Sequence, residues 1–164
     1  MAKYKRKRLI SAISDELRES QNQTDRLDEA AAGLLQINRT DHRCIDILER
    51  NGAMTAGELS AASGLTTGAI TAVLDRLEKR GYAVRARDSA DRRRVLVKLT
   101  TKARELDREI YEPLGQDYAK QIERYTTDEL VLIHDFMRRS KELGAKHLER
   151  IKALMLSAGA ESEQ

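Results

Sequence analysis

Residues 54–100 read MTAGELSAASGLTTGAITAVLDRLEKRGYAVRARDSADRRRVLVKLT, and this stretch carries the signals that decide the fold. Thr55 and Glu58 have the spacing of a capping box, in which each side chain satisfies a free amide at the start of a helix. Ser63-Gly64 then ends this helix, because glycine tolerates the positive φ of a helix terminus. The stretch therefore opens with a short helix followed by a tight turn.

A second helix is predicted after the turn, over about residues 66–80. Its apolar residues recur at i, i+3, i+4 and i+7, the spacing of one buried helix face. They are Ile70, Val73, Leu74 and Leu77. The opposite face starts with the small residues Gly68, Thr71 and Ala72, where a solvated helix normally carries long charged side chains. This composition favours a helix that approaches another molecule closely, although it also fits an ordinary helix start.

The last part of the stretch is predicted to be a basic hairpin over about residues 82–99. Apolar and polar residues alternate along both arms, as in half-buried strands. Asp88 and Asp91 suit the turn between the arms, because their side chains can hydrogen-bond the backbone that follows. The arginines of the hairpin are Arg85, Arg87, Arg92, Arg93 and Arg94. So much local positive charge indicates contact with a polyanion.

The composition of the whole chain fits a helix-rich globular protein of one domain or two small lobes. Of its 164 residues, 40% are hydrophobic and 35% are charged, and the formal net charge is +3. The positive charge is concentrated: residues 1–11 hold five basic and no acidic residues, and residues 82–102 hold seven basic and two acidic residues. The rest of the chain is net acidic, so a specific basic surface is expected rather than diffuse adhesion.

Outside the quoted stretch the sequence predicts long helices. The fold class is mainly α with a small β-hairpin wing: a winged helix-turn-helix domain over residues 37–100, with its second helix as the recognition helix. A long helix over 1–36 precedes this domain, helices over 101–156 follow it, and 157–164 are predicted to be a disordered tail. The long helices have more apolar surface than the small domain can cover, which favours a dimer over a self-contained bundle.

Several functions are disfavoured by missing signals. No apolar run is long enough to cross a membrane, and a single cysteine excludes an intrachain disulfide, so the cytoplasm is the expected location. Cys44 lies on an apolar stripe, which predicts an inert core thiol, with a redox switch as the alternative. His42, His134 and His147 lack the spacing of a helical ligand pair, so neither a metal site nor a cofactor is predicted. No catalytic motif is present, which argues against an enzyme.

The quoted stretch resembles the multiple antibiotic resistance regulator (MarR) family of transcription factors. The resemblance is specific over about residues 34–104 and rests on the family's wing pattern, which falls on Asp88, Asp91, Arg93, Leu99 and Thr100. The family often has arginine where this chain has Ala90, so one wing contact is missing here or is taken by Arg92 or Arg94.

The resemblance implies a homodimer that binds a palindromic double-stranded DNA operator. The first helix and the last two would form the dimerisation lobe, and the protein would be a repressor relieved by a small amphipathic or phenolic ligand. A ligand would lie between this lobe and the winged domain, where His42 and Arg43 are candidate contacts for an anionic group, although both also fit a simply solvated helix start.

The expected DNA contacts follow from the winged-helix arrangement. Small residues and threonines at the start of the recognition helix would read bases, and Arg76 would reach a phosphate or a base edge. Arg92 would enter the minor groove, while Arg93 would either join it or pair with Asp88 or Asp91. The base-reading residues are Thr66, Thr67, Gly68 and Thr71, and the phosphate contacts are Arg87 and Arg94.

Two other functions fit parts of the pattern. A winged domain can serve as a protein-interaction adaptor, but apolar or aromatic anchors would then be expected in place of the wing arginines. A regulator that does not respond to a ligand is the other alternative.

Overall fold

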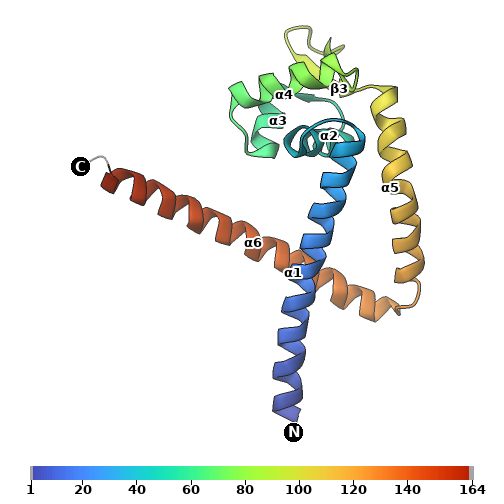
Figure 1. Cartoon of the computed structure of the whole chain (residues 1–164), viewed down its shortest axis with the longest axis vertical. Coiled ribbons are helices and arrows are strands. Elements are labelled where there is room, and N and C mark those ends of the chain that lie inside the picture. The colour runs from blue at the N-terminus through green and yellow to red at the C-terminus, as the bar shows by residue number, and fades with distance from the viewer. Residues whose placement is uncertain (1, 163–164) are drawn as a thin grey trace. The chain divides into compact units, whose positions relative to one another are not determined.

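Six helices and three short strands follow one another in the computed structural model, which describes residues 2–162 and the side chains of residues 5–157 (Figure 1). The elements are α1 (Ala2–Leu34), α2 (Arg39–Asn51), β1 (Met54–Thr55), α3 (Ala56–Ser63), α4 (Thr67–Lys79), β2 (Ala83–Arg87), β3 (Val95–Leu99), α5 (Thr101–Ile122) and α6 (Thr127–Ser162). They form two units, Met1–Glu112 and Pro113–Gln164, so the division falls inside α5 at its proline. The predicted fold class is confirmed.

Local capping signals define the helix starts in the first unit. The Asn38 side chain caps α2 by accepting a hydrogen bond from the Asp41 amide at 2.8 Å. Thr55 and Glu58 form the predicted capping box of α3, and Gly64 ends this helix with a φ of 72°. Only a residue that tolerates positive φ allows the chain to turn so tightly into α4.

One hydrophobic core lies among α2, α3, α4 and the sheet. The predicted apolar stripe of α4 is buried, with Ile70 and Leu77 completely inaccessible to solvent. Tyr82, at the end of the turn after α4, is buried against the same core, and its hydroxyl donates to the Leu35 carbonyl at 3.1 Å. Burial of this stripe fixes which face of α4 remains exposed.

The sheet has the order β1-β3-β2, and all its pairs are antiparallel. Strands β2 and β3 form the predicted hairpin, with Ala83 opposite Leu99 and Arg87 opposite Val95. Strand β1 was not predicted, because two residues carry no periodic pattern. It pairs Thr55 with Leu96 and thereby joins the start of α3 to the wing.

The second unit contains the last part of α5 and α6. Thr126 and Glu129 form a second capping box at the start of α6, in which the Glu129 side chain accepts from the Thr126 amide at 2.8 Å. Helix α6 continues to Ser162, so the prediction of a disordered tail from residue 157 was wrong over 157–162, where no proline ends the preceding helix. Residues 163–164 lie outside the described residues. Among those described, no helix is both long and apolar enough to span a membrane.

Cys44 is completely buried in the core of the first unit, as the sequence predicted. Burial raises the pKa of its thiol to about 11, and the nearby Asp41 carboxylate acts in the same direction. Since the thiolate is the reactive species, the folded state disfavours redox chemistry at this position.

Candidate nucleic-acid interface

The exposed face of α4 starts with the small residues that the sequence predicted. Thr66 caps the helix by accepting from the Ala69 amide at 3.3 Å, and the Thr71 hydroxyl donates to the Thr67 carbonyl at 3.1 Å. All of Thr66, Thr67, Gly68 and Thr71 are exposed. The buried stripe on the other side of α4 directs this face away from the core, so the structure brings the four predicted base-reading residues together at one helix start.

Gly68 is not required by the fold. A Cβ atom built at this position meets nothing within 4 Å apart from its chain neighbours and the backbone of its own helix, and the φ of Gly68 is not in the positive range. The absence of a side chain therefore leaves open space above the start of α4, where another molecule can approach the backbone.

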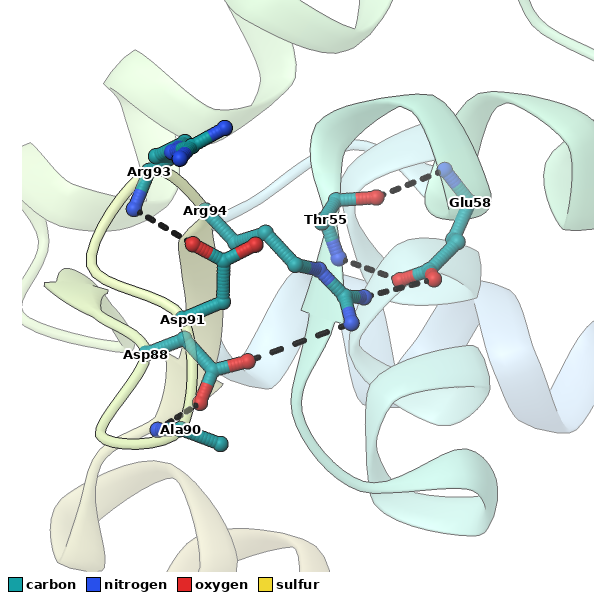
Figure 2. A network of polar contacts seen from close by, with 7 residues as sticks. All are labelled: Thr55, Glu58, Asp88, Ala90, Asp91, Arg93 and Arg94. Carbon is teal, nitrogen blue, oxygen red and sulfur yellow. Dashed lines mark hydrogen bonds and ion pairs between the residues drawn. The ribbon is translucent and has the colours of Figure 1, made fainter.

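The wing loop, residues 88–94, is built by its two aspartates (Figure 2). The Asp88 carboxylate accepts from the Ala90 amide at 2.9 Å, and the Asp91 carboxylate accepts from the Arg93 amide at 3.0 Å. The backbone closes the loop through a 3.0 Å hydrogen bond from the Asp88 amide to the Arg94 carbonyl. The turn chemistry predicted for both aspartates is confirmed.

The wing arginines differ in what they contact. Arg87, Arg92 and Arg93 are exposed, and within residues 5–157 none of their guanidinium groups forms an ion pair. The predicted pairing of the Arg93 side chain with Asp88 or Asp91 was wrong: only its backbone amide contacts Asp91, and its side chain extends away from that carboxylate (Figure 2). In the loop the aspartates engage the backbone and not the guanidinium groups of Arg92 and Arg93, which leaves these side chains available to a ligand.

Arg94 contacts two carboxylates, although the sequence predicted a phosphate contact. One of its terminal nitrogens donates to Glu58 at 2.9 Å, and the other lies 3.9 Å from Asp88 (Figure 2). Arg85, on β2, contacts Asp75 at 2.8 Å and Glu78, both on α4. Sequence reasoning missed both arrangements, because the partners are 7 to 36 residues apart and no periodic pattern links them.

Arg76 contacts the protein's own Asp41, not an outside group. The guanidinium donates two hydrogen bonds to the carboxylate, at 2.9 Å and 2.6 Å, in the bidentate geometry that arginine and carboxylate favour. The Asp41 side chain is only 2% exposed, whereas that of Arg76 is 45% exposed. These hydrogen bonds also raise the pKa of Arg76. The pair joins α4 to the start of α2, whereas Nη1 takes no part in it, so a DNA contact by Arg76 stays a prediction.

His42 and Arg43 lie side by side in sequence but in different environments. His42 is buried, and its Nε2 atom lies 3.1 Å from the Tyr111 hydroxyl, which is also within 3.1 Å of the Asp28 carboxylate. Arg43 is exposed and forms no ion pair among the described residues. The prediction of a simply solvated pair is therefore wrong for His42, which belongs to a hydrogen-bonded group joining α1, α2 and α5.

Both residues line a pocket of about 800 Å³ within the first unit. Its lining includes the His42, Tyr111 and Asp28 group, together with Asp107. Burial raises the pKa of Tyr111, with Asp28 acting in the same direction, and burial followed by Glu49 raises the pKa of Asp107. The charged residues of the wall are Asp25, Asp28, Arg39, Arg43, Asp46, Glu49, Arg50 and Asp107.

Removal of Arg76 is expected to destabilise the winged domain. Replacing Arg76 by alanine leaves the buried Asp41 carboxylate without its partner. The free energy of unfolding should fall by about 3 kcal/mol. This value is at the low end for a buried ion pair, because the arginine is half exposed. Urea denaturation measures the effect. The double variant Asp41→Asn/Arg76→Ala should recover much of the loss, whereas additive losses would contradict this role.

The chain matches known proteins over most of its length. Residues 37–95 match the MarR family. The HTH-type transcriptional regulator YcgE of Bacillus subtilis strain 168, itself uncharacterized, is 40% identical over 124 residues, which are 76% of this chain and 80% of YcgE.

Solved structures show the same fold. A MarR family protein from Bacillus stearothermophilus aligns with a TM-score of 0.63 at 23% identity, over 83% of this chain and 95% of that chain. NadR in complex with 4-hydroxyphenylacetate aligns with a TM-score of 0.57 at 27% identity, over 77% of this chain and 90% of that chain. With these matches, the winged domain and the exposed face of α4, the chain belongs to the MarR family of DNA-binding transcriptional regulators.

Proposed function

We propose that this protein is a cytoplasmic, homodimeric repressor that binds a palindromic DNA operator and releases it when a small amphipathic or phenolic ligand binds. One observation carries the proposal: a helix whose exposed start is made of small residues and threonines belongs to the same domain as a wing with three arginines that form no ion pair within residues 5–157. The helix start suits close approach to base edges, and the arginines suit a phosphate backbone and a narrow groove.

Within this proposal each residue has a role that follows from its environment. Thr66, Thr67, Gly68 and Thr71 read bases, because they are exposed at the helix start and the threonines offer a hydroxyl and a methyl group. The wing contacts are Arg87 on a phosphate, Arg92 in the minor groove and Arg93 beside it, all of them exposed.

Exposed apolar surface on the long helices supports a dimer. Leu9 on α1 is 61% exposed, and Leu132 and Leu154 on α6 are 71% and 67% exposed. Large apolar side chains exposed to this extent along a helix are typical of an interface. A second copy of the chain is the partner we propose, because a two-fold dimer presents two recognition helices to the two halves of a palindrome.

The pocket in the first unit is the effector site that we propose. NadR was solved with 4-hydroxyphenylacetate, a molecule with a phenol at one end and a carboxylate at the other. Here the phenol would donate to a carboxylate of the lining, Asp28 or Asp107, and the ligand carboxylate would contact the exposed Arg43. His42 would orient Tyr111 through their hydrogen bond.

The release mechanism that we propose is a population shift. Helix α2 supplies the pocket residues His42 and Arg43, and the residue before them, Asp41, binds Arg76 on the recognition helix. A ligand that favours one position of α2 would therefore favour one position of α4. The ligand changes the operator affinity only if it binds the two positions of α2 with different affinities.

Operator binding should depend steeply on salt. A dimer that neutralises about six to ten phosphates gives a slope of log K against log salt concentration of about −5 to −9. Fluorescence anisotropy with a duplex selected by the protein from a random library measures this slope, and unselected duplex serves as the comparison. A slope near −1, or equal affinity for both duplexes, would rule out the proposed operator binding.

Substitution of Gly68 by alanine should separate DNA contact from folding. Added helix propensity raises stability by up to about 1 kcal/mol, because the new methyl group meets nothing within the protein. Operator affinity should fall about tenfold or more, since an extra methyl group in a close-packed contact costs roughly 1–3 kcal/mol. Gly33→Ala on α1, also with open space at its Cβ, is the matched control and should leave affinity unchanged. Unchanged affinity in Gly68→Ala would remove this helix start from the interface.

Effector response should depend on Arg43. In Arg43→Ala the concentration of 4-hydroxyphenylacetate needed to release half of the bound operator should rise about tenfold, because a charge-assisted hydrogen bond is lost. Arg108→Ala, an exposed arginine of α5 outside the pocket wall, is the control. Without ligand, the wild type, Arg43→Ala and Arg108→Ala should bind the operator with the same affinity. Equal release in Arg43→Ala and the wild type would exclude Arg43 from the effector site.

A further inference from the structure

The Glu58 carboxylate has two partners in different parts of the winged domain. Its Oε2 atom accepts from the Thr55 amide at 2.7 Å and so completes the capping box of α3. Its Oε1 atom accepts from Arg94 at 2.9 Å. Figure 2 shows both interactions, with Glu58 between the start of α3 and the wing. One side chain therefore joins the helix start to the wing loop.

Arg94 occupies the point where the wing loop meets β3. Its amide and carbonyl both take part in closing the loop, through Asp91 and Asp88. Its side chain turns toward α3 and contacts Glu58 (Figure 2), whereas the Arg93 guanidinium forms no ion pair within residues 5–157. A contact from Glu58 to Arg94 therefore restrains the base of the loop whose tip carries Arg92 and Arg93.

The capping box makes this contact more than a mobile surface pair. Exposed ion pairs usually contribute little to stability, because two long side chains must be ordered to form them. Here the Thr55 amide already holds the Glu58 side chain, and β1 pairs Thr55 with Leu96, two residues after Arg94. The hydrogen bonds from Thr55, followed by the charge of Arg94, lower the pKa of Glu58, so the carboxylate is ionised at neutral pH.

We propose that Glu58 and Arg94 are positioning residues that hold the wing loop against α3, so that Arg92 and Arg93 point toward DNA while Arg94 does not contact it. This inference rests on the proposed operator binding. It predicts whether loss of the Glu58 charge strengthens or weakens DNA binding. If Arg94 contacted phosphates, Glu58 would compete with DNA, and loss of its charge would strengthen binding. If Glu58 positions the wing, loss of its charge weakens binding, even though a negative charge near the DNA has been removed.

Substitution of Glu58 by glutamine distinguishes these two roles. Glutamine at this helix position still completes a capping box, so α3 remains intact while the charged contact with Arg94 is lost. Affinity for the selected duplex should fall about threefold to tenfold, because the wing must then be ordered on binding. Affinity for unselected duplex should stay equal or rise slightly. Hydrogen exchange of the amides in residues 88–94, measured without DNA, should become faster.

Two further variants complete the test. Glu105→Gln removes the same charge from an exposed position of α5 and should change neither affinity nor loop exchange. Arg94→Gln should match Glu58→Gln, and the double variant should be no weaker than either single one, because both remove the same contact. Tighter binding by Glu58→Gln, or unchanged exchange of the wing amides, would overturn the positioning role. A wild-type protein that selects no duplex would instead overturn the proposed operator binding, whatever the exchange rates are.

Discussion

The carboxylate of Asp41 is buried, and a buried charge is stable only with a well-placed partner. Arg76 supplies this partner through two hydrogen bonds and thereby joins the first turn of α2 to the last turn of α4. Burial of the apolar stripe decides which face of α4 is exposed, and this pair ties that helix to α2. His42, which lines the pocket, directly follows Asp41 in the chain, and Asp41 binds Arg76 on the recognition helix.

The arginines of the winged domain divide into two groups by their partners. Arg76, Arg85 and Arg94 bind carboxylates of the protein itself and connect α4 or the wing to neighbouring elements. Arg87, Arg92 and Arg93 are exposed and, within residues 5–157, have no ion pair. The basic surface available to DNA is therefore smaller and more directional than the number of arginines in the sequence indicates. In the proposed positioning role, an arginine that orders the wing would contribute to recognition by reducing the motion that binding must remove.

The pocket shares its residues with the framework of the first unit. Tyr111 on α5 contacts both Asp28 on α1 and His42 on α2, so three helices meet at one hydroxyl group. In the proposed mechanism a ligand that alters this contact would act on the packing of α2, and the Asp41 and Arg76 pair would extend the effect to α4. Packed interiors respond to such changes by moving between discrete arrangements, which suits a regulator with a DNA-binding and a released state.

Local sequence determined much of this protein. Capping boxes at Thr55 and Thr126, the positive φ at Gly64, the apolar stripe of α4 and the Asx turns of the wing all follow from neighbours a few residues apart, and the structure confirms each of them. Only the tertiary structure decided which arginines are engaged, that β1 joins the wing, and that His42 is buried. The partners of Arg76 and Arg94 are 35 and 36 residues away, and charge pairing over such distances leaves no periodic signal. The chain must fold before the environment of those side chains exists.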